Sequence, residues 1–282
     1  MGNNDIILYK DITANDDLVR LAEEKLHLKA VTELPANLDE KTPGSDNIAD
    51  KVSESAPVLA IDSDGISLIA GNQKIYGDFS KEIPRITNES RLNGELLIKA
   101  AKVKTRNHEL MAIDATAGLG EDALLLAAYG YRVTMYERDP VIGLLLYDAL
   151  RRASEIPELA DIVDRMTLKM EDSIAAMQNF MQVADQAAIT EVPNVATRPD
   201  IILLDPMFPK RKKSGLIKKK FQVLHYLEQP CADEAELLAA AKAAHPKKII
   251  IKRPAKGPFL ADEKPSYSIK GDSIRYDCII NI

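Results

Sequence analysis

A predicted strand that runs into a glycine turn and then a helix constrains this chain more than any other stretch. Residues 111–113 are apolar and predict the strand, and residues 122–129 predict the helix. Gly118 and Gly120 lie between them, where glycine allows a tight turn and a close approach to a ligand. The pattern Gly-x-Gly-x-x-Ala, ending at Ala123, predicts a nucleotide-binding turn of a doubly wound α/β fold. Taken alone, the same glycines also suit an ordinary strand-to-helix turn.

Two further predicted strands end in acidic residues. Residues 132–136 predict a strand that ends at Glu137, about 20 residues after the first glycine, where an acidic side chain binds ribose hydroxyls in such folds. Residues 200–204 predict a buried strand, followed by Asp-Pro-Met-Phe-Pro at 205–209. Because ligands of an open α/β sheet bind beyond the carboxyl ends of its strands, we expect these groups to converge on one crevice.

The pentapeptide is a variant of the Asp/Asn-Pro-Pro-Tyr/Phe motif of enzymes that methylate exocyclic amines of bases. The Asp205 carboxylate and a backbone carbonyl could accept the two N–H bonds of such an amine and aim its nitrogen at a methyl donor. Pro206 would fix the turn, and Phe208 would stack on a base swung out of its helix. We predict that these three residues act mainly by positioning the reactants. Singly, they also fit a strand-ending turn and core packing.

A run of basic residues follows this motif in a chain whose net charge is −6. Charge runs are often solvated loops or helix faces, but this one stands beside the predicted base pocket. We therefore predict that it contacts RNA phosphates, and that two residues at the end of the next predicted strand extend it. The predicted RNA-binding residues are Lys210, Arg211, Lys212, Lys213, Lys218, Lys219, Lys220, Lys252 and Arg253.

The sequence predicts two domains. Residues 1–88 form a small α/β domain that includes a helix capped by Asn15, a hairpin turning at 63–65 and a third strand at 75–79. The polar stretch 35–57 within it predicts a flexible loop.

Residues 89–282 form the larger domain, in which strands alternate with helices, as in a parallel sheet. Its last strand follows a loop rather than a helix and is expected to be antiparallel. Its predicted elements also include a helix at 89–102 interrupted at Gly94-Glu95, a helix starting at Asp139-Pro140, a strand at 167–170, helices at 174–181 and 233–244, and strands at 248–252 and 274–280.

Composition bounds the class of protein. Hydrophobic residues make up 46% of the chain and charged residues 28%, as in globular proteins. Cys231 and Cys278 are far apart and without a metal-ligand spacing, so we expect a reduced, cytoplasmic protein with no metal site. No apolar run reaches membrane length, and the polar N-terminus does not resemble a signal peptide. We expect a monomer.

The combined motifs resemble those of the RsmJ family, bacterial methyltransferases of a guanine exocyclic amine in small-subunit (16S) ribosomal RNA. The resemblance covers about residues 90–282 and is poor before them. It rests on Asp-Ala-Thr-Ala-Gly-Leu-Gly-x-Asp at 114–122, Glu137-Arg138 with Pro140, Leu-Asp-Pro-Met-Phe-Pro at 204–209, Lys213-Ser214 with Lys219-Lys220, and Lys252-Arg253-Pro254.

This resemblance implies a Rossmann-like class I methyltransferase sheet that uses S-adenosyl-methionine and acts on ribosomal RNA or an assembled small subunit. It implies that the cofactor is contacted by Glu121, Asp122, Glu137, Arg138, Asp172, Ser173 and Asp205. The glycine turn adds Asp114, Gly118 and Gly120 to the predicted cofactor site. Three alternatives stay open: an NAD-dependent oxidoreductase, a methyltransferase acting on another substrate, and an RNA-binding protein without enzymatic activity.

Overall fold

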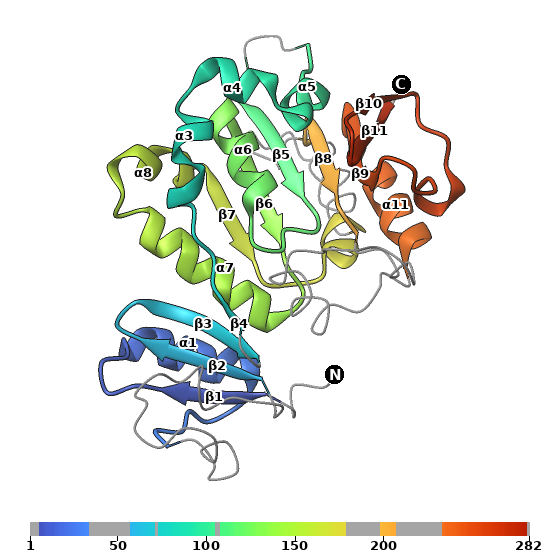
Figure 1. The fold of residues 1–282 in the computed structure, drawn as a ribbon. Helices are drawn as coiled ribbons and strands as arrows, with labels where there is room; N and C mark the ends of the chain where they lie inside the picture. The colour runs from blue at the N-terminus through green and yellow to red at the C-terminus, as the bar shows by residue number, and fades with distance from the viewer. Residues whose placement is uncertain are drawn as a thin grey trace, which may run out of the picture. The chain divides into compact units, whose positions relative to one another are not determined.

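The computed structural model describes residues 6–33, 57–70, 73–104, 108–178, 198–206 and 233–280. They fall into two compact units, each with its own sheet (Figure 1). Unit one holds the described residues up to Asp78 and Asp139–Arg152, and unit two holds the other described residues. The division into domains 1–88 and 89–282 stays a prediction.

Unit one contains a four-stranded sheet of order β1-β2-β3-β4 and the helix α1 (Asp16–Leu26). The predicted hairpin is confirmed as β2 and β3, and Asn15 caps α1 by accepting the N–H groups of Asp17 and Leu18. The third strand lies earlier than predicted, because only Ile75 of the predicted 75–79 belongs to it. The strands are β1 (Ile7–Lys10), β2 (Val58–Asp62), β3 (Gly65–Ala70) and β4 (Gln73–Ile75).

Helix α7 (Pro140–Ala153) lies almost entirely in unit one. As predicted, Asp139 caps it, since its carboxylate accepts the N–H groups of Val141 and Ile142 at 2.9 and 3.1 Å. Asp148 is fully buried and accepts the N–H of Ile66 on β3 at 3.0 Å. This carboxylate therefore ties α7 to the hairpin within unit one.

Unit two contains a seven-stranded sheet of order β10-β11-β9-β8-β5-β6-β7. The strands from β9 to β7 are mutually parallel, whereas β11 runs antiparallel to β9 and β10 antiparallel to β11. The prediction of a parallel sheet with an antiparallel closing strand is confirmed, and β10 is an addition to it. The strands are β5 (Leu110–Asp114), β6 (Tyr131–Tyr136), β7 (Met166–Lys169), β8 (Ile201–Leu204), β9 (Lys248–Pro254), β10 (Tyr267–Lys270) and β11 (Ile274–Ile280).

Strand β5 is an inner strand of this sheet, between β6 and β8 (Figure 1). The chain proceeds from β5 to β6 and β7 on one side and later to β8 and β9 on the other. The order therefore reverses between β5 and β8, and such a switch point is where open α/β sheets bind ligands.

The helices of unit two include the predicted interrupted helix, which is confirmed as two helices that meet at Glu95. The helix α11 contributes Leu237, Leu238 and Ala241 to a buried core shared with β5, β8 and β9. Within the described ranges, no helix has the length and hydropathy needed to cross a membrane. The helices are η3 (Ser80–Glu82), α3 (Ile83–Ile86), α4 (Glu89–Gly94), α5 (Leu96–Ala101), α6 (Glu121–Tyr129), α8 (Pro157–Val163), α11 (Glu234–Ala243) and η4 (Leu260–Asp262), and residues 173–178 are also helical.

Candidate active site at the carboxyl ends of β5, β6, β8 and β9

The glycine turn follows β5 and leads into α6. Gly118 and Gly120 have φ of +55° and +78°, in the left-handed region that favours glycine, and Gly120 is the N-cap residue directly before α6. A Cβ placed on Gly118 would meet no heavy atom within 4 Å. The turn therefore needs glycine for its backbone conformation, and the space beside Gly118 is open.

Glu137 holds this turn to the neighbouring strand. It follows β6 and is only 7% exposed. Its Oε2 accepts the N–H of Gly118 at 2.9 Å, and its own N–H donates to the Lys169 carbonyl on β7 at 3.0 Å. The predicted spacing between the first glycine and the acidic residue thus corresponds to a direct contact.

Three residues link the end of β5 to the end of β8. Asp114 is the last residue of β5, is 2% exposed, and accepts the N–H of Thr116 at 3.1 Å. The Thr116 hydroxyl oxygen accepts the N–H of Asp205, directly after β8, at 2.6 Å. Burial raises the pKa of Asp114 to about 8, and the nearby carboxylates of Asp122 and Asp205 act in the same direction.

Lys252 on β9 bridges two of these carboxylates. Its Nζ lies 2.6 Å from Oδ2 of Asp122, in the first turn of α6, and 3.0 Å from Oδ2 of Asp205. Burial lowers the pKa of Lys252, but the two carboxylates raise it by more, so that the net shift is upward. Partial removal from water raises the pKa of Asp205, although its side chain stays 41% exposed, and Lys252 opposes that shift. The ammonium is therefore the counter-charge of an acidic cluster.

Other predicted cofactor residues lie at the same edge of the sheet or beside it. Asp172, after β7, accepts the N–H groups of Ile174 and Ala175 at 2.7 and 3.3 Å, so it caps the helix 173–178. Ser173 is buried, and the half-exposed Arg138 lies 3.8 Å from the Asp233 carboxylate. Their contacts with a cofactor stay a prediction.

The position of Arg253 argues against its predicted contact with RNA phosphates. It is 1% exposed, donates to the Pro258 carbonyl at 3.1 Å and lies 3.2 Å from a carboxylate oxygen of Glu234. A phosphate contact needs an exposed head group, whereas this guanidinium packs within unit two. Neighbouring residues of a strand point to opposite faces of the sheet. Because the side chain of Lys252 points toward Asp122 and Asp205, that of Arg253 points to the other face.

Several predicted residues lie outside the described residues. They are Phe208, Lys210, Arg211, Lys212, Lys213, Lys218, Lys219 and Lys220. Pro206 is described and follows Asp205 directly.

Three side chains contribute to this region without having been predicted. Thr116 lies within the sequence motif, between Asp114 and the first glycine, and a hydroxyl at that place could have indicated a hydrogen-bonding role. Tyr276 of β11 is the register partner of Lys252 and is 3% exposed. Arg275 holds the loop after β9 by donating to the carbonyls of Pro254 and Gly257 at 2.8 and 2.9 Å. The positions of Tyr276 and Arg275 follow from the register between β9 and β11, which cannot be predicted from the sequence motifs.

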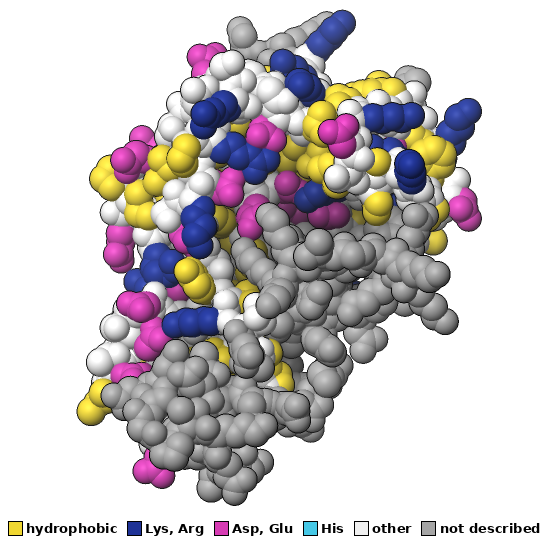
Figure 2. Space-filling model, in the orientation of Figure 1, with side chains coloured by type: hydrophobic (Ala, Val, Ile, Leu, Met, Phe, Trp, Pro, Cys, Tyr) yellow, Lys and Arg dark blue, Asp and Glu magenta, His cyan; other side chains and the backbone are white. Residues whose placement is uncertain are grey.

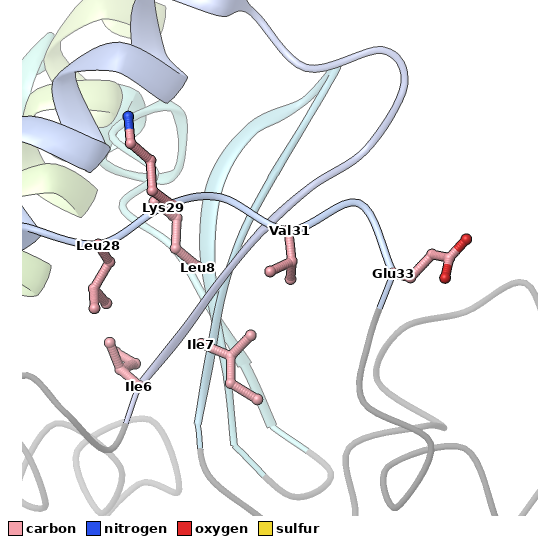
Figure 3. Close-up of a pocket in the computed structure, with 7 residues that line it drawn as sticks. All are labelled: Ile6, Ile7, Leu8, Leu28, Lys29, Val31 and Glu33. Carbon is pink, nitrogen blue, oxygen red and sulfur yellow. The ribbon is translucent and has the colours of Figure 1, made fainter.

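Within the part of the chain that the structure describes, the other surface features do not indicate a second reaction centre. On the face in Figure 2, Lys and Arg side chains are spread among acidic and apolar ones. Among the described residues, no group of three or more His, Cys, Asp or Glu side chains could hold a metal ion. A cavity of about 470 Å³ in unit one is mainly apolar (Figure 3); its lining consists of Ile6, Ile7, Leu8, Leu28, Lys29, Val31 and Glu33.

Comparisons with known proteins find similar sequences over most of the chain. A family model described as "Putative SAM-dependent methyltransferase" matches residues 48–281. The "Ribosomal RNA small subunit methyltransferase J" of Pseudoalteromonas atlantica is 42% identical over 192 residues, or 66% of this chain and 70% of that protein. The protein of the same name from Neisseria meningitidis is 34% identical over 228 residues, or 79% and 84% of the two chains. That from Hahella chejuensis is 39% identical, and the match spans 65% of this chain and 63% of that protein's length.

A solved structure shares the fold. The crystal structure of a SAM-dependent methyltransferase from Neisseria gonorrhoeae is similar with a TM-score of 0.69 and 28% sequence identity. The similarity covers 97% of this chain and 95% of that one. The fold expected from the resemblance, a Rossmann-like class I methyltransferase sheet, is thereby confirmed.

Proposed function

This chain belongs to the ribosomal RNA small subunit methyltransferase J family of SAM-dependent methyltransferases, and we propose that it methylates the exocyclic amine of a guanine in small-subunit ribosomal RNA. The observation that carries this proposal is the meeting of Asp205, Lys252 and the glycine turn at the switch point of the sheet. RNA as substrate, guanine as target and a monomeric state are proposals.

The described residues fit S-adenosyl-methionine. When bound, this cofactor supplies an electrophilic methyl group on a positively charged sulfur. The carboxylates of Asp122 and Asp205 share a single ammonium, that of Lys252, so the cluster keeps a net negative charge that suits a ligand with positive charge. The open space beside Gly118 and the adjacent Glu137 carboxylate suit the nucleoside part, because an acidic residue at this place binds ribose hydroxyls. We propose that these residues hold the cofactor, together with Gly120, Glu121, Arg138, Asp172 and Ser173.

An ionised carboxylate at the end of β8 favours guanine among the bases that carry an exocyclic amine. Guanine presents two neighbouring donors, the ring N1–H and the N2 amine, whereas adenine and cytosine present an amine beside an acceptor nitrogen. An ionised Asp accepts hydrogen bonds only, and its two oxygens match two neighbouring donors. Asp205 would therefore bind the guanine edge and orient the N2 nitrogen.

The chain's contribution to the reaction is then positioning. The Thr116 hydroxyl fixes the backbone of Asp205, Lys252 fixes its carboxylate, and Pro206 sets the direction in which the chain leaves β8. Phe208 is proposed to stack on the base, which must leave its helix to reach the site. The amine loses a proton as it gains the methyl group, and solvent receives that proton, since this proposal assigns no separate general base.

The experiment is transfer of radiolabelled methyl groups to unmodified small-subunit ribosomal RNA or subunits, followed by digestion to nucleosides. We expect label in a guanosine methylated at N2, and a loss of about 100-fold in kcat for Asp205→Asn, which keeps the size but not the charge. Asp161→Asn, at an exposed position of α8, is the matched control and should retain activity. Label in another nucleoside would contradict the guanine proposal. Absence of label with cofactor binding intact would contradict RNA as the substrate.

A further inference from the structure

Lys252 lies where three elements of unit two meet. It is on β9, and its ammonium contacts Asp122 of α6 at 2.6 Å and Asp205 after β8 at 3.0 Å. Its side chain is 25% exposed, whereas the Asp205 side chain is 41% exposed. The carboxylate is therefore more open to a substrate than the cation that holds it.

This arrangement differs from that of a phosphate-binding lysine. A lysine that binds phosphate as a point charge keeps its ammonium available to the ligand. The ammonium of Lys252 instead has two carboxylate partners at short distance. RNA phosphates would have to compete with both of them, so the contacts favour a role within the site.

The ammonium of Lys252 reduces the electrostatic repulsion between the carboxylates of Asp122 and Asp205. Asp122 and Asp205 both lie within 3.0 Å of one ammonium, and Asp114 lies close enough to act on both electrostatically. Without Lys252, the carboxylates of Asp122 and Asp205 would face each other without a cation between them. The lowest-energy response would be protonation of Asp205 or rotation of its side chain away from Asp122.

We propose that Lys252 is a positioning residue for methyl transfer, which bridges Asp122 to Asp205 and so holds the Asp205 carboxylate ionised and directed at the guanine amine. This inference rests on the proposed function and adds to it a residue that acts through Asp205. It replaces the prediction that Lys252 contacts RNA phosphates.

The first test is a steady-state comparison of Lys252→Met and Lys252→Arg with the wild type, using the same RNA. We expect Lys252→Met to lower kcat by about 10- to 100-fold and to change KM for RNA by less than about threefold, because the lost contact orients a reacting group. Lys252→Arg keeps the charge and should recover most of the lost kcat. A phosphate contact predicts the opposite: a higher KM, a smaller salt dependence and an unchanged kcat. That result would overturn the proposal.

The second test is the pH dependence of kcat. The charged and titratable groups that act on Asp205 are Lys252 and Arg253 on β9, Asp122 on α6, Asp114 on β5 and Tyr276 on β11. Removing the nearest cation raises the pKa of Asp205, so the acidic limb of the profile should move to higher pH in Lys252→Met. It should return toward the wild-type position in Lys252→Arg. An acidic limb that stays in place in Lys252→Met would overturn the proposal.

A third measurement needs neither cofactor nor RNA. Thermal unfolding of unloaded Lys252→Met should show stability that falls relative to the wild type as pH rises from about 5 to 8, because the carboxylates must ionise without their counter-charge. The matched control is Lys247→Met, which also removes an ammonium 2.6 Å from a buried carboxylate, that of Asp200, at the opposite end of β8. Lys247→Met should lower stability while leaving kcat and the acidic limb unchanged.

The outcomes separate this inference from the function it rests on. A wild type that transfers no methyl group to RNA would overturn the proposed function, and this inference with it. An active wild type together with a Lys252→Met variant of equal kcat and equal pH profile would overturn the inference alone. A Lys247→Met variant that loses kcat as strongly as Lys252→Met would also overturn it, because the effect would then be one of general stability.

Discussion

The N–H of Asp205 donates a hydrogen bond of 2.6 Å to the hydroxyl oxygen of Thr116. Thr116 belongs to the turn after β5, and Asp205 is the first residue after β8. The ladder between these strands ends just before, where the Ala115 N–H donates to the Leu203 carbonyl at 3.0 Å. A side chain thus continues the strand pairing by one step and links the glycine turn to Asp205.

Thr116→Val should remove the hydrogen bond between the glycine turn and Asp205 while keeping the shape of the side chain. The Asp205 N–H would lose its acceptor, and we expect a loss of about 1 kcal/mol in the free energy of unfolding. We expect a larger proportional effect on kcat, about 10-fold, because Asp205 would no longer be held in place. Denaturant unfolding and the methyl-transfer assay measure the two effects. Thr116→Ser keeps the hydroxyl and is the control; equal activity of the Val and Ser variants would contradict the prediction.

The open space beside Gly118 allows its backbone conformation to be tested separately from steric contact. A Cβ at either Gly118 or Gly94 would meet no heavy atom within 4 Å, but only Gly118 has a positive φ, of +55°. Gly118→Ala should therefore cost about 1 kcal/mol in stability and weaken binding of S-adenosyl-methionine, since the turn must shift. Gly94→Ala, at the end of α4, should be neutral or stabilising. Calorimetric titration and thermal unfolding of both variants give the comparison, and equal behaviour of the two would refute it.

The sequence predicted the fold well where local signals were strong. The glycine turn, the Asn15 and Asp139 caps and the fully apolar run of β8 each specify local structure through a short range of residues. Together with alternation of strands and helices, they led to the parallel sheet with its antiparallel closing strand. Strand β10 was missed because none of its four residues is buried, so it carries no hydrophobic pattern that the sequence could reveal.

The site was harder to predict, because its contacts depend on register between strands far apart in the sequence. The motifs identified Asp205 and the glycine turn, and the spacing to Glu137 corresponds to a real contact with Gly118. The charge of Lys252 suggested a partner in RNA, but its place on β9 directs it to Asp122 and Asp205. Composition alone cannot tell a lysine that faces solvent from one that faces carboxylates on neighbouring elements.

The basic residues after the Asp-Pro motif give a prediction about salt. If they contact phosphates, Lys219→Ala/Lys220→Ala should raise KM for RNA and leave kcat nearly unchanged. The slope of log KM against log salt should then fall by roughly one to two, since each phosphate contact contributes about 0.7 to 0.9. The control is Lys25→Ala/Lys29→Ala in unit one, where each lysine pairs with a glutamate. A salt slope equal to that of the wild type would count against the phosphate contacts.

Two buried aspartates of unit two should give opposite pH dependences of stability. Burial raises the pKa of Asp114 from 3.8 to about 8. Between these two pH values the folded protein keeps the proton on Asp114, whereas the unfolded chain has already released it. The contribution of Asp114 to the free energy of unfolding therefore falls as pH rises from about 4 to 8, by up to about 1.4 kcal/mol per pH unit. Asp114→Asn removes this dependence, and its stability relative to the wild type should increase with pH across that range.

Asp200 is the matched case of opposite sign. Burial alone would raise its pKa, but hydrogen bonds from Lys247 and the Met111 N–H and one with His108 lower it below 3.8. Its contribution is present above the unfolded pKa and is lost as pH falls through the lower folded value. Asp200→Asn should therefore be less stable than the wild type at neutral pH, with a difference that shrinks below about pH 4. Chemical unfolding of the wild type and both variants from pH 3 to 8 measures the free energy of unfolding at each pH. Parallel curves of this free energy against pH for the two variants would show that Asp114 is ionised like an ordinary carboxylate.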